Sequence, residues 1–306
     1  MAASPRTGYV LLLLSVLCNG ATYHLSHWAL KDLSPAMVNL CGNFASVGFM
    51  LAGGVLWRAV GWRAGEVHVV TPRSIAHCFA GQWRLIFLAT ALGSIGGWLN
   101  SGANQAYGPA LTAFLANLTL VFLVIFGVLS GERLTLLEVL AIVVILAGAF
   151  MFSWRDGALL WGAVGIMVLS CLGGAGKQMT VKRATALGNM PSMMAATLAL
   201  MGAWTVLIGL ATGTLQVPAP KPLLITAVAG LTGSVLGMTF LYTGYHAVGV
   251  SRGAPLDAMR PMVVLLIGLL LGAAIPGPVQ LAGGAMVVGG SVALAVMVAG
   301  RTKRLK

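Results

Sequence analysis

The chain has 306 residues, of which 58% are hydrophobic and only 8% are charged. Soluble globular domains carry about 25% charged residues, so this composition excludes a soluble protein and requires several apolar membrane spans of about 20 residues each. The net charge of +12 comes from basic residues that cluster between the apolar runs, where they set topology, and it therefore indicates no nucleic-acid partner.

Ten apolar runs predict an all-α membrane protein with ten transmembrane helices. The first run follows a single basic residue and could also be read as a signal peptide. Because its apolar character continues to Leu30, we expect it to be retained as a span. The runs are 8–30, 35–57, 84–104, 108–130, 135–153, 158–177, 191–212, 222–244, 253–273 and 278–299.

Basic residues are distributed very unequally between the two sides of these spans. Fourteen of the 18 Lys and Arg residues fall on the side that holds both termini. The positive-inside rule therefore predicts cytoplasmic termini, in the plasma or inner membrane of the cell. The longest loop, 57–84, combines four arginines with three tryptophans. This composition suits the interface of an anionic leaflet, and a solvated linker that only enforces topology is an equal alternative.

The sequence repeats itself in two halves. A shift of 142 residues places 87–149 on 229–291, with apolar residues on apolar residues nearly throughout. The predicted units are 8–153 and 158–299, followed by a basic cytoplasmic tail, 300–306. Five is an odd number of spans, so the second unit must insert upside down relative to the first. Inverted repeats of this kind are typical of transporters that alternate access around a central site.

The stretch LTLVFLVIFGVLSGERLTLLEVLAIVVILAGAFMF (118–152), after GSIGGWLNSGANQAYGPALTAFLAN (93–117), resembles the EamA-type domain of the drug/metabolite transporter superfamily. The segment AVGVSRGAPLDAMRPMVVLLIGLLLG (247–272) resembles the same element in a second copy. The resemblance covers almost the whole chain as two tandem domains. It implies a ten-helix exporter or importer of small metabolites, with a cavity between the halves, and it does not identify the substrate.

This chain departs from the family pattern at two positions. Glu132 closes the fourth span, but Ala274 stands at the corresponding position of the second copy, so this acidic residue is not a symmetric functional element. The fourth span has Thr119 where the family often has proline, whereas the second copy keeps Pro261. Glu132 also lies just before a capping-box sequence, Thr135 to Glu138, which indicates a structural role for this segment.

Asp257 and Arg260 lie inside the ninth predicted span. A charge at bilayer depth costs at least about 2.5 to 3.5 kcal/mol on insertion scales, so each residue needs a partner or a watery cavity. A spacing of three places the two side chains on one helix face. Pro261 has no amide hydrogen, and its ring crowds the carbonyl of Asp257, so the helix should break here. The pair is predicted to bind substrate; a purely structural ion pair is the alternative.

Five further residues complete the predicted substrate-binding set. Asn19 and Asn117 lie mid-span, where a buried amide must be satisfied by another helix or by ligand and water. Thr119 lies beside Asn117, and Trp98 and Tyr242 are candidate aromatic walls. Packing alone is the alternative role for each. Polar residues near the ends of the runs are interpreted as interfacial edge residues. They are His27, Asn104, Lys177 and His246.

These features predict a carrier of small metabolites, such as amino acids or related organic solutes, that works by alternating access and includes export among its possible directions. The expected partners are the solute, the lipid bilayer and, as a candidate co-substrate, protons. A membrane-embedded enzyme and a non-transporting scaffold are the alternatives. The sequence has no HExxH or GxGD motif, and its four cysteines show no metal-like spacing, so we expect no enzyme activity, metal or cofactor.

Overall fold

Helices make up almost all of the computed structural model, which describes residues 5–59, 70–129, 135–155, 158–185, 190–248 and 256–304. Two strands of two residues each pair antiparallel, with Trp154 opposite Leu159. The elements are α1 (Pro5–Ala29), α2 (Pro35–Ala59), α3 (Pro72–Tyr107), α4 (Pro109–Ala116), α5 (Leu118–Leu129), α6 (Leu136–Phe152), β1 (Trp154–Arg155), β2 (Ala158–Leu159), α7 (Trp161–Thr185), α8 (Met190–Ala211), α9 (Pro220–Ala229), η1 (Gly230–Gly237), α10 (Met238–Val248), α12 (Arg260–Leu270) and α13 (Pro278–Arg304).

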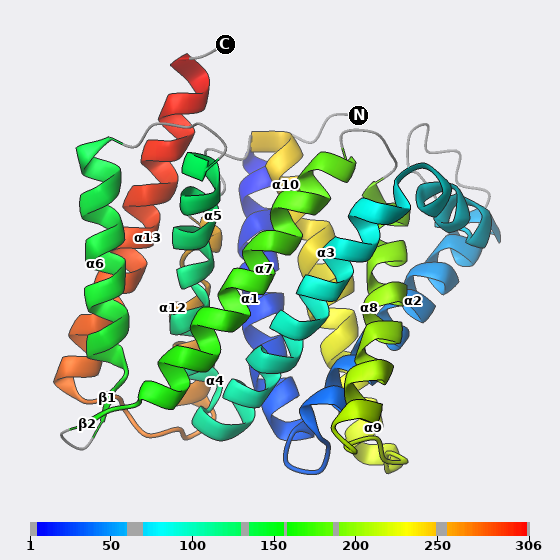
Figure 1. The fold of residues 1–306 in the computed structure, drawn as a ribbon, viewed down its shortest axis with the longest axis horizontal. Coiled ribbons are helices and arrows are strands. Elements are labelled where there is room, and N and C mark those ends of the chain that lie inside the picture. The colour runs from blue at the N-terminus through cyan, green and yellow to red at the C-terminus, as the bar shows by residue number, and fades with distance from the viewer. Residues whose placement is uncertain are drawn as a thin grey trace.

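The helices stand side by side and alternate in direction, so that the first and last described residues lie at the same edge of the molecule (Figure 1). Helices α4 and α5 follow one another across Asn117. The π-helix η1 continues α9 into α10 in the same way. Counted with these joins, the described residues form ten successive helical rods. Figure 1 also shows that α1 starts at the edge that holds the termini, whereas α7 starts at the opposite edge.

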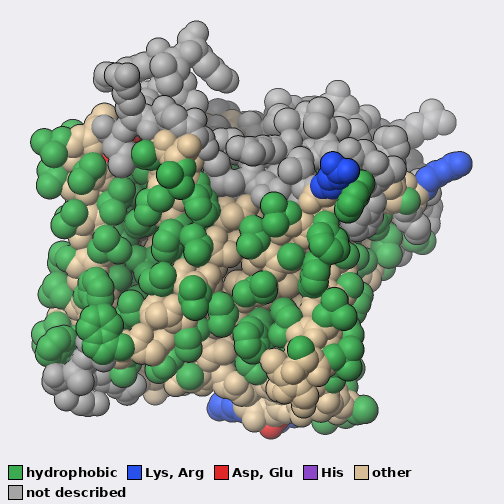
Figure 2. All heavy atoms as spheres, viewed as in Figure 1, with side chains coloured by type: hydrophobic (Ala, Val, Ile, Leu, Met, Phe, Trp, Pro, Cys, Tyr) green, Lys and Arg blue, Asp and Glu red, His purple; other side chains and the backbone are tan. Residues whose placement is uncertain are grey.

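The outer surface of the bundle is apolar, as a lipid environment requires. Figure 2 shows hydrophobic side chains over the face between the two rims, and the Lys and Arg side chains that are visible lie at the rims. In the described part of the chain, six helical segments are long and apolar enough to cross a membrane, and α6 and α12 are shorter apolar helices. The six are Arg6–Ala29, Pro35–Val55, Pro109–Leu129, Ser192–Ala211, Pro220–Tyr245 and Pro278–Met297.

Helix α3 begins earlier than the sequence predicts. The apolar run starts at Arg84, but the helix starts at Pro72 and has 36 residues. At 1.5 Å per residue it is about 54 Å long, which exceeds the roughly 30 Å of a hydrocarbon core. Its first turns therefore extend beyond the core, where Trp83 is exposed and stacks under the Arg84 guanidinium at 5.4 Å. Hydropathy locates the membrane boundary, and the helix does not have to end there.

The fifth predicted span begins with the expected capping box. The Thr135 side chain accepts a hydrogen bond from the Glu138 amide at 3.3 Å, and the Glu138 carboxylate accepts one from the Thr135 amide at 2.7 Å. Two backbone donors at the start of α6 are thereby satisfied. The capping box predicted from the sequence is confirmed. Glu132, the other acidic residue of this segment, lies outside the described residues.

The two halves of the chain pack together through several helix pairs. Helix α6 lies along α13, and α2 lies along α8. Helix α3 contacts α7, and in the same manner α1 contacts the continuous rod of α9, η1 and α10. Small residues make these contacts close: a Cβ added to Gly96 would lie 2.8 Å from the carbonyl oxygen of Ser170. The Ser170 hydroxyl also donates to the Gly96 carbonyl at 2.7 Å.

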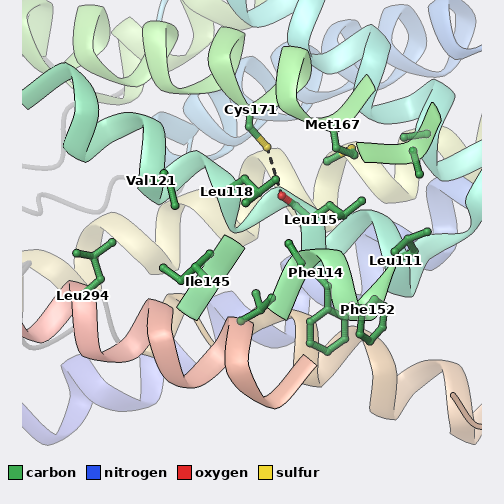
Figure 3. Close-up of a cluster of buried hydrophobic side chains, with 14 of the residues drawn as sticks. Leu111, Phe114, Leu115, Leu118, Val121, Ile145, Phe152, Met167, Cys171 and Leu294 are labelled. Atoms are coloured by element: carbon green, nitrogen blue, oxygen red, sulfur yellow. Dashed lines mark hydrogen bonds between the residues drawn. The ribbon is translucent and has the colours of Figure 1, made fainter. Parts of the chain in front are cut away.

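The largest buried apolar cluster joins the fourth and fifth rods to α7 and α13 (Figure 3). Phe114 stacks on Phe152 with 4.0 Å between the ring centroids. The Cys171 thiol points at the Leu115 carbonyl oxygen at 3.5 Å. Cys171 therefore acts as a buried packing residue.

Candidate functional site

The ninth predicted span is broken at its charged pair. Residues Ala258 and Met259 form a turn, and α12 starts only at Arg260, with Pro261 in its first turn. The Met259 amide donates to the Leu256 carbonyl at 3.0 Å, a three-residue spacing that is tighter than an α-helical turn. The break predicted from Pro261 is confirmed. The continuous helix expected over 253–273 is not observed, because proline cannot donate a backbone hydrogen bond inside a helix.

Arg260 pairs with Asp257 across this turn. The Arg260 Nη2 atom donates to Asp257 Oδ1, and 27% of each side chain remains exposed. The same guanidinium lies near the Tyr23 hydroxyl on α1 and interacts with it electrostatically. Its Nε atom has no partner among the described residues. The arginine is therefore neutralised by a carboxylate and still retains one free donor.

Tyrosines from two helices surround the pair. Asp257 interacts electrostatically with Tyr242 and Tyr245 of α10, while Tyr23 comes from α1 on the Arg260 side. Tyr242 is thus close enough to the ion pair to interact with Asp257, and its role as an aromatic wall of a substrate site stays a prediction. The pair lies in a junction between α1, α10 and α12.

Asn117 connects the first half of the chain to the same break. Its Nδ2 atom donates to the Ala258 carbonyl oxygen at 3.0 Å. Asn117 is the residue that separates α4 from α5, so the irregular point of the fourth rod contacts the irregular point of the ninth. The repeat of 142 residues aligns Ala116 with Ala258, and these two breaks occupy equivalent places in the two halves.

The other three predicted site residues lie elsewhere. Asn19 donates to the Ser15 carbonyl of its own helix at 2.9 Å and packs against Gly237 of η1. Thr119 lies against Gly174 of α7, about 4.0 Å from the position of an added Cβ. Trp98 is half-buried on α3. The structure therefore groups Asp257, Arg260, Asn117 and Tyr242 but not these three.

A polar cavity of about 180 Å³ lies between the two halves. Helices α1, α2 and α3 form one side of it, and α9 and η1 form the other. Its described lining consists mainly of amides and hydroxyls and contains no charged side chain. The lining residues are Thr22, Tyr23, Ser26, Val38, Asn39, Gly42, Asn43, Asn100, Ser101, Asn104, Thr226, Ala229, Gly230 and Ser234.

Sequence reasoning missed this lining as a set. None of the seven predicted site residues is part of it, and Asn104 was interpreted as an edge residue, which is wrong because it is 2% exposed inside the bundle. A signal was nevertheless present, since polar residues four apart share one helix face. Three helices carry such a pair facing the cavity: Thr22 with Ser26 on α1, Asn39 with Asn43 on α2, and Asn100 with Asn104 on α3.

Hydrogen bonds across the cavity wall tie its helices together. Asn39 donates to the Gly97 carbonyl at 3.2 Å and to the Ser101 hydroxyl at 2.9 Å. Asn104 donates to the Tyr23 carbonyl at 3.0 Å. Tyr23 lines the cavity and also approaches Arg260, so this residue links the neutral cavity to the charged pair.

The cavity borders the one π-helical segment found in the described residues. Within η1, Gly230 packs so closely on α2 that an added Cβ would lie 2.6 Å from the Gly42 carbonyl oxygen. Gly233 approaches Thr22 of α1 in the same way, at 2.7 Å. Segments of π-helix are frequent at functional sites, because the wider turn changes which residues face inward. The π-helix η1 therefore forms part of the cavity wall, and its backbone packs directly on α1 and α2.

A second cavity of about 290 Å³ lies at the start of α4 and the end of α12, with a more apolar lining. His24 lines it and hydrogen-bonds the Val264 carbonyl at 2.8 Å. None of the seven predicted residues lines this cavity either. In the described part of the chain, no group of three His, Cys, Asp or Glu side chains is arranged to hold a metal ion.

Comparisons with known proteins agree with this architecture. The model of the EamA-like transporter family matches twice in tandem, over residues 6–154 and 158–296. A solved chain described as a crystal structure of a protein superposes with a TM-score of 0.65 at 17% identity, covering 98% of this chain and 100% of that chain. That likeness shows a shared fold. No curated protein gave a significant match. With both halves matched in full, the chain belongs to the EamA-like transporter family and is a multi-pass membrane protein.

Proposed function

We propose that the chain is a carrier that moves small polar organic solutes across the membrane by alternating access. The supporting observation is the polar cavity, which α1 to α3 of the first family match and α9 and η1 of the second match line together. A solute bound there would touch both halves. If one half rocks against the other, the cavity opens to one side of the membrane and then to the other.

We propose that the two halves form an inverted repeat of five helices each, an arrangement that would permit this motion. The pairs α6 with α13 and α2 with α8 each join equivalent helices of the two halves. The contact of α3 with α7 has its counterpart in the contact of α1 with the α9–η1–α10 rod. Opposite starting edges of α1 and α7 in Figure 1 agree with a two-fold axis in the membrane plane. We therefore assign the two units to 8–153 and 158–299.

The charged junction is proposed to act beside the cavity. Tyr23 lines the cavity and interacts with Arg260, so we propose that a substrate group that displaces this tyrosine would reach the free Nε donor of Arg260. Asn117 and Tyr242 hold this junction in place, and Asn19, Trp98 and Thr119 remain proposed contributors through the packing of α1, α3 and α5. Amino acids and related solutes are the first candidates for transport. Protons, as co-substrate, would act at Asp257.

The proposed function is tested by measuring the uptake of solutes into liposomes that contain the protein. Purified protein reconstituted in liposomes should take up at least one member of a panel of amino acids, nucleosides, organic acids and cationic drugs, faster than protein-free liposomes and with saturation. Each assay is run with and without a pH gradient, which separates proton-coupled from uncoupled carriage. A scaffold would carry none of them, and a membrane-embedded enzyme would convert a solute without moving it.

A second expected result concerns the orientation of the protein in the membrane. Both termini are proposed to face the cytoplasm, since the side that holds them carries 14 of the 18 basic residues. Single cysteines placed in 60–69 and in 301–306, in a background without the native cysteines, should react with a membrane-impermeant maleimide only after the cells are opened. Labelling of one position from outside and of the other from inside would contradict the ten-span arrangement.

A further inference from the structure

Two asparagines in the cavity wall have amide atoms without protein partners. Asn43 on α2 is 9% exposed and Asn104 on α3 is 2% exposed. The Asn43 Nδ2 donor and the Asn104 Oδ1 acceptor make no hydrogen bond within the described residues. Buried polar atoms are almost always paired, and leaving one unpaired costs more than a typical hydrogen bond contributes. Both residues line the same cavity, so a solute bound there is the candidate partner for these two buried atoms.

Not every side-chain amide in the cavity wall has an unpaired atom. Asn39 lies one turn before Asn43 on the same helix and lines the same cavity. Its Nδ2 atom donates to the Pro35 carbonyl at 2.8 Å, to the Gly97 carbonyl at 3.2 Å and to the Ser101 hydroxyl at 2.9 Å. The amide of Asn39 therefore serves the fold, whereas the Asn43 donor does not.

Charge is absent from the described lining of the cavity. An ionised solute that enters it would lose its hydration and find no opposite charge, which costs far more than moving a neutral polar group. Asp257 and Arg260 already neutralise each other and lie outside the lining. The cavity has a volume of about 180 Å³, so the solute is small.

We infer that this cavity is a binding site for small uncharged solutes, such as polyols or simple amides, which it recognises through Asn43 and Asn104. The inference rests on the proposed carrier function and narrows its substrate class. A hydroxyl or carbonyl oxygen of the solute accepts from Asn43 Nδ2, and a hydroxyl or amide hydrogen donates to Asn104 Oδ1. A buried site that hydrogen-bonds such groups rejects analogues without them, because its own polar atoms would otherwise stay unpaired.

The experiment uses probes of similar size that differ in charge. Erythritol and propionamide are the neutral probes, and threonine, malate and putrescine are the zwitterionic, anionic and cationic ones. We expect erythritol or propionamide to raise the unfolding temperature of the purified protein and to enter proteoliposomes with saturation. Malate and putrescine should do neither, and threonine should be carried less efficiently than the neutral probes.

Two leucine substitutions separate recognition from stability. Asn43→Leu removes a donor that no protein group uses, so the protein should unfold at the same or a higher temperature while its affinity for erythritol falls about tenfold. Asn39→Leu, the matched control one turn away, removes an amide donor that the Pro35 carbonyl, the Gly97 carbonyl and the Ser101 hydroxyl share, and it should lower the unfolding temperature. A purely structural role for Asn43 predicts the opposite: loss of stability with unchanged affinity.

The possible failures point to different conclusions. Transport of threonine, malate or putrescine without any neutral probe would overturn the inference and leave the carrier function intact. Stabilisation by erythritol without flux of any solute would support the site and contradict the carrier. Absence of both stabilisation and flux with the neutral probes would overturn the inference whatever else the protein transports.

Discussion

The substitution Gly148→Leu should prevent stable packing of α6 against α13. A Cβ at this position would lie 2.6 Å from the Gly283 carbonyl oxygen and 2.8 Å from the Val287 amide nitrogen. Both contacts are with backbone, which cannot rotate away as a side chain can. Overpacking a well-packed interface typically costs about 1 to 3 kcal/mol, and a leucine against two backbone atoms belongs at or above the upper end. We expect loss of the monodisperse protein peak in detergent and a strongly lowered unfolding temperature.

A nearby glycine provides the control. Gly289 lies on α13, and an added Cβ there meets no atom within 4 Å. Gly289→Ala should therefore leave the fold intact, or stabilise it slightly, because alanine is favoured over glycine in a helix. Gly290, the repeat equivalent of Gly148, should be less sensitive, since its added Cβ would lie 2.8 Å from the Ile145 side chain, which can move, and 3.2 Å from the Ala141 carbonyl oxygen. Normal yield and stability of Gly148→Leu would show that α6 and α13 do not pack as described.

Removal of one charge of the Asp257–Arg260 pair should strongly lower the stability of the protein. Asp257→Leu leaves Arg260 in the bundle without its carboxylate, and breaking a buried pair from one side costs about 3 to 5 kcal/mol. Each side chain is 27% exposed, so water screens part of the charge. We therefore expect the loss of stability to lie at the lower end of this range. Unfolding of the purified variant, followed by temperature or by denaturant, provides the measurement.

The double substitution distinguishes a structural pair from a functional one. Asp257→Leu combined with Arg260→Met removes both charges, and replacing a buried pair by apolar residues is often neutral or stabilising. We expect this variant to fold and to lose flux, because the free donor of Arg260 beside Tyr23 is gone. Arg260→Lys should weaken flux without unfolding, since lysine lacks the planar fork. A folded double variant with normal flux for every solute would exclude the pair from the mechanism.

The order of rods and the irregular ninth span follow from sequence alone. Twenty-residue apolar runs must become helices in lipid, because every backbone polar group has to be satisfied within its own segment. Local chemistry similarly predicts the capping box at Thr135 and the break before Pro261, since both depend on neighbours within four residues. The early start of α3 at Pro72 escaped prediction, because hydropathy ends at the membrane boundary and helical hydrogen bonding does not.

The cavity was decided only by tertiary structure. Its lining draws Ser26, Asn43 and Asn104 from three helices of the first half and Ser234 from the second, and no local rule fixes how those helices rotate about their axes. That rotation is set by close contacts such as Gly230 against the Gly42 carbonyl, which depend on both partners at once. The same holds for Asn117, whose bond to Ala258 joins residues 141 positions apart. Sequence thus determined which residues are polar within the membrane, and packing determined which of them meet.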